Sequence, residues 1–275
     1  MDLKKIKKIS YGLRKKIFQS IYDGNGGHIG GSFSVIDLLT YLYAEILKID
    51  PTNPEDPDRD RLIFSKGHSC QALYWALAEF KFFEEEIIMD YGSDGALFAG
   101  HPEFEKAPGI EISSGSLGHG PAIGVGMAYA AKLKNKNFDV YVIVGDGESN
   151  EGSVWEAAMS AAQLKLSNFH LIIDNNGMES LEKTDNIMSI EPIDKKLKAF
   201  NFDVVRFNGH DFKEIKKAFE INKELSNDKP KAYIADTIKA YGISFTQADT
   251  KWHFRAPSDD ELEKGLKELD LVIDA

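Results

Sequence analysis

The sequence has few of the features that mark secreted, membrane-spanning or nucleic-acid-binding proteins. Its 275 residues include one cysteine, Cys70, so no disulfide can form within the chain, and a reducing compartment is favoured. It has no secretory signal pattern, and no apolar run approaches the roughly 18 residues of a transmembrane helix. Acidic residues (44) outnumber lysine and arginine (33), which gives a net charge of −11 and no basic face for nucleic acid. These absences predict a cytoplasmic protein that binds neither membrane nor nucleic acid.

Two segments allow a second interpretation. The start of the chain combines lysines with isoleucine and leucine at helical spacing, which is typical of a surface helix. Contact with an anionic membrane is the alternative. Cys70 follows Lys66-Gly67-His68, so a reactive thiol is conceivable. Because no base and orienting partner are evident for it, a buried structural thiol is the preferred interpretation.

The sequence does contain a regular alternation of strand-like and helix-like segments. Strands are predicted at 62–64, 139–144, 169–173, 203–207 and 231–237. Helices are predicted at 3–22, 35–47, 69–81, 83–90, 121–135, 153–166, 192–200, 212–226 and 258–270. The strands are apolar on both faces, which requires helices on both sides of a parallel sheet. We therefore expect an α/β fold, a three-layer doubly wound parallel sheet, in a single domain spanning residues 1–275.

Helix starts can be read from polar residues before the apolar periodicity. Ser32 or Ser34 is expected to cap the second helix, and the segment 65–68 to cap the third. Ser258 is expected to cap the last helix, because three acidic residues follow it in the first turn.

Glycine and polar residues follow four of the predicted strands. Lys66-Gly67-His68 follows the first strand, Gly145-Asp146-Gly147 the second, Asn175-Asn176 the third, and the segment 239–242 the last. Open parallel sheets bind ligands beyond the carboxyl ends of their strands. These four groups are therefore predicted to meet at one edge of the sheet.

The Gly145-Asp146-Gly147 turn has the chemistry of a metal and phosphate site. Glycine on both sides of an aspartate lets the backbone turn sharply and approach a ligand closely. Carboxylate, amide and carbonyl oxygens are typical ligands of Mg²⁺, and backbone N–H groups can bind phosphate. An Asp-Gly pair alone is ordinary turn chemistry. Followed by a helix, a strand and Asn175-Asn176, it becomes a strong pattern.

That arrangement resembles the thiamine diphosphate motif, and longer runs resemble the transketolase family in particular. The similar runs are GGHIGGSFSVIDLLTYLY (26–43), DRLIFSKGHSCQALY (60–74), GHPEFEKAPGIEISSGSLGHG (100–120), GDGESNEGSVWEAA (145–158), KLSNFHLIIDNN (165–176) and TIKAYGISF…KWH (237–253). The resemblance covers nearly the whole chain, but only the first half of a transketolase. It implies the thiamine diphosphate-binding fold and transfer of a two-carbon ketol group from a ketose phosphate to an aldose phosphate, as in the pentose phosphate pathway.

The missing half has consequences for the assembly. In the family, a second domain binds the aminopyrimidine ring of the cofactor and supplies the glutamate that activates it. The resemblance therefore implies the N-terminal subunit of a split transketolase, whose partner would be a C-terminal, pyrimidine-binding subunit. An apolar, glycine-rich surface around residues 115–131 is the expected interface, and two copies of each chain are the expected assembly.

The resemblance also implies roles for individual residues. Metal ligands, for Mg²⁺ or for Ca²⁺ or Mn²⁺ in its place, would be the side chains of Asp146 and Asn176 and the carbonyl of Met178. The residues that contact the cofactor would be Gly147, His68 and His253 at the diphosphate, Gly115 and Leu117 at the rest of the molecule, and Asn176 through the metal. The catalytic residues would be His28 and His101 at the substrate, His68 and His253 nearby, and Glu151 near the dimer axis.

Histidine suits the proton transfers that such a reaction needs near neutral pH. Four of the seven histidines lie in loop or glycine-flanked contexts: His28, His68, His101 and His253. His170 and His210 are interpreted as ordinary structural residues. His119 is left unassigned, since the family usually has glutamine at this position.

Other departures bear on the substrate. Ile29 replaces the usual proline, Gln247 a common acidic residue, and Phe254-Arg255 the glycine that generally follows the last histidine. Phe254 could reshape the substrate mouth and Arg255 could add a cation there. Two alternatives therefore stay open: a related acyloin or ketol transferase with a non-standard acceptor, and a non-catalytic binding subunit that retains the fold.

Overall fold

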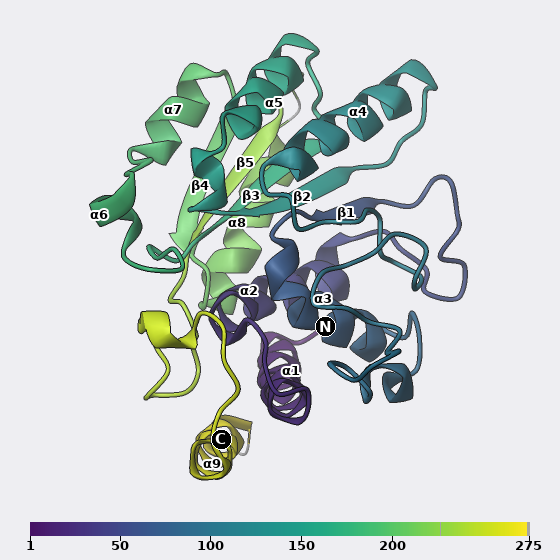
Figure 1. Cartoon of the computed structure of the whole chain (residues 1–275). Helices are drawn as coiled ribbons and strands as arrows, with labels where there is room; N and C mark the ends of the chain where they lie inside the picture. Colours follow the sequence, from purple (N-terminus) through teal and green to yellow (C-terminus); the bar gives the residue numbers. More distant parts are fainter. Residues whose placement is uncertain (226, 274–275) are drawn as a thin grey trace.

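A five-stranded parallel sheet forms the middle layer of the structure, with strand order β1-β2-β3-β5-β4 (Figure 1). The computed structural model describes residues 1–225 and 227–273; the predicted helix end at 226 and the predicted domain end at 275 lie outside them. The strands are β1 (Arg61–Phe64), β2 (Val140–Gly145), β3 (Phe169–Asn175), β4 (Asp203–Asn208) and β5 (Lys231–Asp236). All five predicted strands are confirmed.

Helices cover both faces of the sheet and enclose two apolar cores (Figure 1). One layer holds α1 (Leu3–Asp23), α2 (Ile29–Tyr41), α3 (Cys70–Glu79) and α8 (Phe212–Glu224), with α9 (Asp259–Ile273) packed on α1. The other layer holds α4 (His119–Leu133), α5 (Gly152–Gln163) and α7 (Ile193–Ala199). Alternate residues of β2 enter opposite cores, Ile143 one and Val142 the other. The predicted three-layer α/β fold is confirmed.

The second helix starts earlier than predicted. It begins at Ile29, so Ser32 and Ser34 are buried inside the helix and are not its caps. The glycines before them indicated a loop by helix propensity. Tertiary packing overrides that preference, because an added Cβ at Gly30 would lie only 2.8 Å from Cε of Lys239. Glycine here permits close contact between α2 and the loop after β5.

Two other local predictions were wrong. The predicted helix at 83–90 is only a 3₁₀ turn, Glu85–Ile88. Segment 65–68 does not cap α3 through a side chain; a 3₁₀ turn, Gly67–Ser69, leads into the helix. Short 3₁₀ turns also occur at Glu148–Asn150 and Thr250–Trp252, a π-helical turn extends α2 over Leu42–Ile46, and the short α6 spans Thr184–Ile187.

The predicted cap of the last helix is confirmed. The backbone N–H of Ser258 donates to the Glu261 carboxylate at 2.8 Å, and the N–H of Glu261 donates to Oγ of Ser258 at 3.3 Å. This reciprocal pair is a capping box.

A buried polar cluster ties α1 and α2 to the loop after β5. The fully buried Arg14 donates to both carboxylate oxygens of Asp37, each at 2.7 Å, and to the carbonyl of Tyr241 at 2.9 Å. His210 contacts Asp37 through Nδ1 at 2.8 Å, and its Nε2 accepts the backbone N–H of Ile238 at 2.9 Å. His210 is therefore structural, as predicted, and it helps to fix the segment that carries Lys239.

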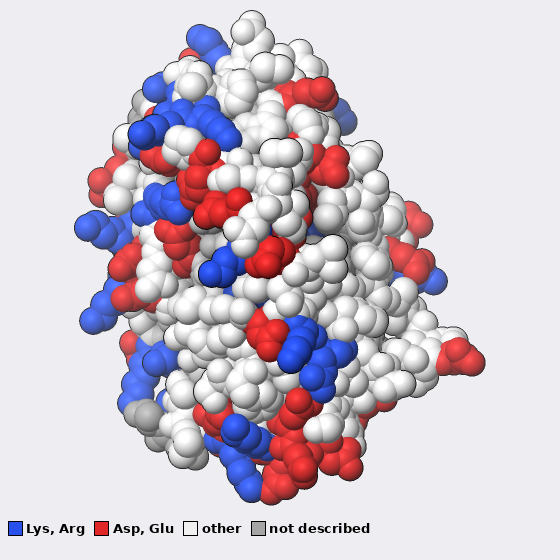
Figure 2. Space-filling model, turned by 60° about the vertical axis from the view of Figure 1, so that its left-hand side comes forward, with Lys and Arg blue, Asp and Glu red and all other residues white. Residues whose placement is uncertain are grey.

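The surface agrees with the low basic content of the sequence. On the face shown in Figure 2, lysine and arginine side chains are interspersed with aspartate and glutamate and form no continuous basic patch. Among the described residues, no helix is long and apolar enough to cross a membrane.

Candidate active site

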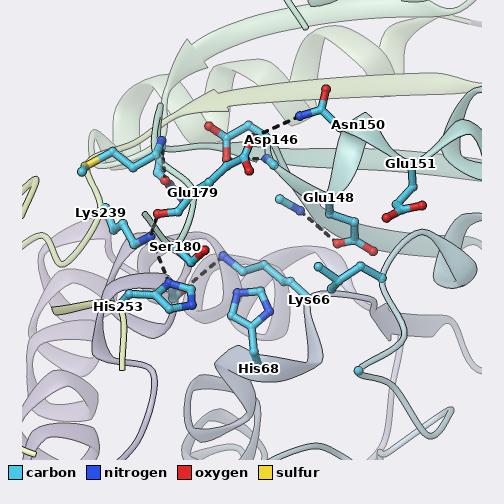
Figure 3. A pocket seen from close by; sticks show the side chains of 17 residues that line it. Lys66, His68, Asp146, Glu148, Asn150, Glu151, Glu179, Ser180, Lys239 and His253 are labelled. Carbon is cyan, nitrogen blue, oxygen red and sulfur yellow. Dashed lines mark hydrogen bonds between the residues drawn. The ribbon is translucent and has the colours of Figure 1, made fainter. Parts of the chain in front are cut away.

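A cavity of about 450 Å³ lies beyond the carboxyl ends of the strands, where the sequence places its polar turns (Figure 3). Its lining residues are Gly31, Lys66, His68, Gly115, Leu117, Gly145, Asp146, Gly147, Glu148, Asn150, Glu151, Asn176, Met178, Glu179, Ser180, Lys239 and His253. All of the predicted site residues line it except His28 and His101, which lie beside it.

Asp146 is held at the end of β2 with its carboxylate buried. One of its oxygens accepts the N–H of Gly147 at 2.9 Å and the other that of Gly177 at 2.6 Å. Burial, and then the negative charge of Asp174, raise the pKa of Asp146 to about 7, although the two N–H donors and Lys66 act in the opposite direction. A cation beside this carboxylate would relieve the cost of burying its charge.

Asn176 and Met178 follow β3 and turn toward Asp146. Oδ1 of Asn176 accepts the N–H of Met178 at 3.1 Å, and Gly177 between them has a φ of 74°, which favours glycine. A bridge between Met178 and Lys183 closes the turn. One carboxylate, one amide oxygen and a backbone carbonyl therefore border the same cavity, and they fit Mg²⁺ or Ca²⁺. No three His, Cys, Asp or Glu side chains form a metal-binding group in the part of the chain that the structure describes.

Lys66 brings a buried positive charge to the cavity. Its side chain is 1% exposed, forms an ion pair with Asp174 and donates to the carbonyl of Gly31 at 3.1 Å. Hydroxyl groups of Ser34 and Thr237 also donate to Asp174. Burial alone would raise the pKa of Asp174, but Lys66 and the hydroxyl donors hold it below its usual value.

Lys239 is the second lysine at the cavity (Figure 3). Its amino group donates to the carbonyl of Glu179 at 2.5 Å and lies 3.1 Å from Nδ1 of His253. Burial and the charge of Lys66 lower the pKa of Lys239 to about 8. Two cations at one cavity favour an anionic ligand. Neither lysine has a predicted role, although Lys66 lies two residues after the end of β1 and Lys239 three residues after the end of β5.

The four predicted histidines form one cluster. The ring centroid of His28 lies 5.2 Å from that of His68, 5.1 Å from that of His253 and 6.4 Å from that of His101. Phe254 lies against the same ring at 4.8 Å. Residues from four separate loops therefore meet at the mouth of the cavity.

Three of these histidines are kept neutral. Burial, followed by the charges of His253, His101 and the two lysines, lowers the pKa of His28 to about 3. Burial and the neighbouring lysines lower the pKa of His253 to about 4, and burial with Lys66 lowers that of His68 well below its usual value. Neutral imidazoles can accept protons from a bound ligand.

The segment 115–118 forms a wall of the cavity that begins beside His101. Gly115 has a φ of 138°, and an added Cβ there would lie 2.8 Å from Cδ2 of His101. Glu148 fixes this wall to the end of β2, because its carboxylate accepts the N–H of Gly118 at 2.9 Å and that of Gly145 at 3.2 Å. Glu148 is 3% exposed and was not predicted as a site residue, because nothing in its local sequence pattern distinguishes it from a surface glutamate.

The remaining predicted residues lie at the edge of the site. Glu151 is exposed where the cavity meets the start of α5. His119, left unassigned, begins α4, is exposed and does not line the cavity. Arg255 is paired with Glu261 at 2.5 Å and lies over the ring of Trp252 at 4.3 Å, so its charge is engaged away from the cavity.

Known proteins share this sequence and this fold. A family model described as the transketolase, thiamine diphosphate binding domain matches residues 7–271. One of the subunits of the apulose-4-phosphate transketolase of Phocaeicola vulgatus is 39% identical over 256 residues, which cover 93% of this chain and 90% of that protein. The 6-deoxy-6-sulfo-D-fructose transketolase subunit SqwG of a Clostridium species is 36% identical over 258 residues, 94% of each chain.

A solved structure extends the similarity to three dimensions. The transketolase of Campylobacter jejuni superposes with a TM-score of 0.92 at 31% identity, over 98% of this chain and 43% of that chain. The family match includes the sheet, both helical layers and every predicted site residue. The chain therefore belongs to the transketolase family of transferases and carries its N-terminal, thiamine diphosphate-binding domain.

Proposed function

We propose that this chain is the N-terminal subunit of a cytoplasmic two-component transketolase, folded as one thiamine diphosphate-binding domain over residues 1–275. The complete enzyme would transfer a two-carbon ketol group from a ketose phosphate to an aldose phosphate. The observation that carries the proposal is the cavity itself, which combines a set of hard oxygen ligands at Asp146 and Asn176 with two lysines and neutral histidines. That combination suits a metal-bound diphosphate next to a proton-transfer site.

The lining residues fall into three groups according to what they would bind. Asp146, Asn176 and the carbonyl of Met178 would hold Mg²⁺, or Ca²⁺ or Mn²⁺ in its place. Lys239 and the N–H of Gly147 would bind the diphosphate, and His68 and His253 would lie beside them. Residues that would contact the cofactor beyond the metal are His68, Gly115, Leu117, Gly147 and His253.

The proton transfers would fall to the histidine cluster. Thiamine diphosphate supplies the electron sink that makes cleavage and formation of the carbon–carbon bond possible. His28 and His101 would face the hydroxyl groups of the sugar, and His68 and His253 would lie between them and the diphosphate. A neutral ring accepts a hydroxyl proton and later returns it. Glu151, exposed at the rim, would face the partner protein.

The partner would dock on the outer face of α4 and α5. This face exposes Ile123, Tyr129 and Leu133 of α4 and Met159 of α5, and it adjoins the cavity. Exposed apolar side chains grouped in this way favour a protein interface. The two relatives named as subunits support a two-part enzyme, and we propose a C-terminal, pyrimidine-binding subunit in an assembly with two copies of each chain.

Gly126 provides a specific test of that interface. It is exposed on α4, and an added Cβ would meet no atom within 4 Å. Gly126→Gln is therefore expected to leave the isolated chain as stable as wild type or more stable, because glutamine favours a helix by roughly 0.5–1 kcal/mol over glycine. In the complex, the longer side chain is expected to block close packing and to prevent assembly, measured by sedimentation. Gly12→Gln in α1, also without a neighbour within 4 Å, is the matched control and should assemble normally.

Ketol transfer by the assembled protein tests the function directly. This chain is mixed with a C-terminal transketolase subunit from the same organism, thiamine diphosphate and Mg²⁺, and transfer from a ketose phosphate to an aldose phosphate is measured. Activity is expected only when both chains are present. A complex that forms but acts on no ketose donor would contradict the proposal.

Phe254 supports a second candidate, a ketol or acyloin transferase with a non-standard acceptor. Its ring is 60% exposed and lies against His28 at the mouth of the cavity, where an acceptor would enter. Comparing phosphorylated with unphosphorylated acceptors in the same assay separates the two candidates. A strong preference for the unphosphorylated acceptor would favour the second.

A further inference from the structure

A second cavity, of about 250 Å³, lies at the amino ends of the strands, at the opposite edge of the sheet from the active site. Tyr141, His170, Lys231 and Tyr233 of the sheet line it from one side, and Asn222 and Lys223 of α8 from the other. A strand of six or seven residues, roughly 20 Å, separates the two cavities. The second cavity therefore plays no part in the chemistry proposed above.

Asn222 is an anomaly in the core-facing side of α8. The helix buries Phe212, Ile215, Ala218 and Phe219 on this side, and Asn222 continues the same face with no exposed surface. Neither the oxygen nor the nitrogen of its amide has a hydrogen-bond partner of normal distance and angle, although the hydroxyl of Tyr233 lies close enough for a weak interaction. Leaving a buried polar group unpaired costs about 1–3 kcal/mol. An amide that borders a cavity and lacks a protein partner of normal geometry points to a partner inside the cavity.

His170 repeats the pattern on the sheet side. Its Nδ1 is buried without a hydrogen bond, and its Nε2 has only a long contact, 3.4 Å, to the carboxylate of Asp139. Burial keeps the pKa of His170 below its usual value, so the ring is neutral and offers one donor and one acceptor. The ring of Tyr141 stacks on it at 4.3 Å. The walls therefore offer neutral hydrogen-bonding groups beside flat apolar surfaces.

Charged groups complete the lining. Lys231 is 8% exposed and donates to the carbonyl of Ser167 at 3.1 Å, which leaves donor capacity on its amino group. Lys223 is exposed at the rim. Two acidic residues are also present, but Asp139 is paired with Lys48 at 3.5 Å and Glu45 with the N-terminal amine. The lining thus favours a ligand that carries one negative charge.

We propose that this cavity is a second binding site, for a small polyhydroxylated molecule with one phosphate or carboxylate group. A hydroxyl group both donates and accepts, so it can satisfy the amide of Asn222 and the ring of His170 in either role. The aromatic rings would pack against the C–H faces of the molecule, and Lys223 and Lys231 would bind its anionic end. The volume lies just below the roughly 300–1,000 Å³ of common ligand sites, which limits the molecule to about the size of a pentose phosphate.

Calorimetric titration of the full chain with ribose 5-phosphate, ribose and inorganic phosphate tests the proposal. Thiamine diphosphate and Mg²⁺ are present in one series, to fill the active site, and absent in another. Ribose 5-phosphate is expected to bind in both series, and Asn222→Leu to weaken it at least tenfold. Lys223→Ala is expected to weaken ribose 5-phosphate but not ribose. Lys217→Ala, on the same helix and outside the cavity, is the matched control and should bind as wild type does.

Measuring the unfolding temperature distinguishes a binding defect of Asn222→Leu from a folding defect. Without ligand, Asn222→Leu is expected to unfold at the same temperature as wild type or higher, because it removes an unpaired buried amide. Ribose 5-phosphate should raise the unfolding temperature of wild type but not that of Asn222→Leu. Three results would overturn the proposal: no saturable binding by wild type, equal binding by Asn222→Leu, or a crystal structure with the sugar phosphate in which the cavity holds ordered water only. None of these depends on whether the assembled enzyme transfers ketol groups.

Discussion

Asp146→Asn is expected to abolish metal-dependent binding of thiamine diphosphate and to lower ketol transfer by at least about a thousandfold. The substitution keeps the shape of the side chain but removes the one negative charge in the proposed set of metal ligands. Without that charge, neither Mg²⁺ nor the diphosphate it would bridge is held in place. Calorimetry of the assembled complex with cofactor, with and without Mg²⁺, measures the binding, and the two-chain assay measures the activity.

The same variant should not lose stability. Asp146 is 2% exposed. Burial and the negative charge of Asp174 raise the pKa of its carboxyl group to about 7, so the ionised carboxylate opposes folding when no cation is bound. The amide nitrogen of asparagine cannot accept a hydrogen bond, so the variant loses one of the two backbone N–H contacts, which offsets the gain from removing the buried charge. In metal-free buffer we therefore expect Asp146→Asn to unfold at a urea concentration close to that of wild type. Loss of function together with nearly unchanged stability would identify a residue whose main role is binding.

Asp94→Asn, in an exposed loop away from the cavity, is the control and should behave as wild type does in both assays. If wild type itself bound no cofactor in a metal-dependent manner, the non-catalytic interpretation of the chain would replace the proposed function. If Asp146→Asn bound cofactor and Mg²⁺ normally, the assignment of the metal site would be wrong.

Lys66→Met is expected to cost about 3–5 kcal/mol of unfolding free energy, the usual penalty for removing one partner of a buried ion pair. Asp174 would keep its hydrogen bonds from Ser34 and Thr237 but would have no adjacent cation, in a position with no exposed surface. Urea denaturation measures the loss. Lys217→Met, an exposed lysine of α8, should change stability by less than about 0.5 kcal/mol.

The double variant Lys66→Met, Asp174→Asn separates stability from function. It removes both charges and leaves an amide whose oxygen can accept one hydroxyl and whose NH₂ group can donate to the oxygen of the other, so most of the lost stability should return. Cofactor affinity should stay low, because the positive charge next to the diphosphate is still missing. If the double variant were no more stable than Lys66→Met, the unpaired carboxylate would not be the cause of the loss.

The parts of the site that the sequence predicted are those with a local signal. Asp146 and Asn176 follow predicted strands in a recognisable order, so their position at the cavity could be inferred. Lys66 and Lys239 stand in the same kind of position, but a lysine after a strand has many uses, and only the fold brings the two to one cavity. Glu148 is assigned by its three-dimensional contacts alone.

The fold was predictable for a similar reason. Strands that are apolar on both faces require a parallel sheet covered on both sides, whatever the details of the connections. The start of α2 was not predictable, because its glycines are unfavourable in a helix. Gly30 is required there by its contact with Lys239, more than 200 residues away in the sequence, and Gly31 by its contact with Ser69. Helix propensity depends on residues that are close in the sequence, whereas the start of α2 is set by residues that are close in space.

The cluster of Arg14, Asp37 and His210 has a consequence for how the protein is made. Arg14 leaves the ribosome more than 200 residues before its acceptor Tyr241 and the cavity residues Lys239 and His253. Until those residues appear, the guanidinium and the carboxylate beside it have only part of their final set of partners. The nascent chain can pair β1, β2 and β3 early, but it cannot complete the cavity until α1 and the loop after β5 have met.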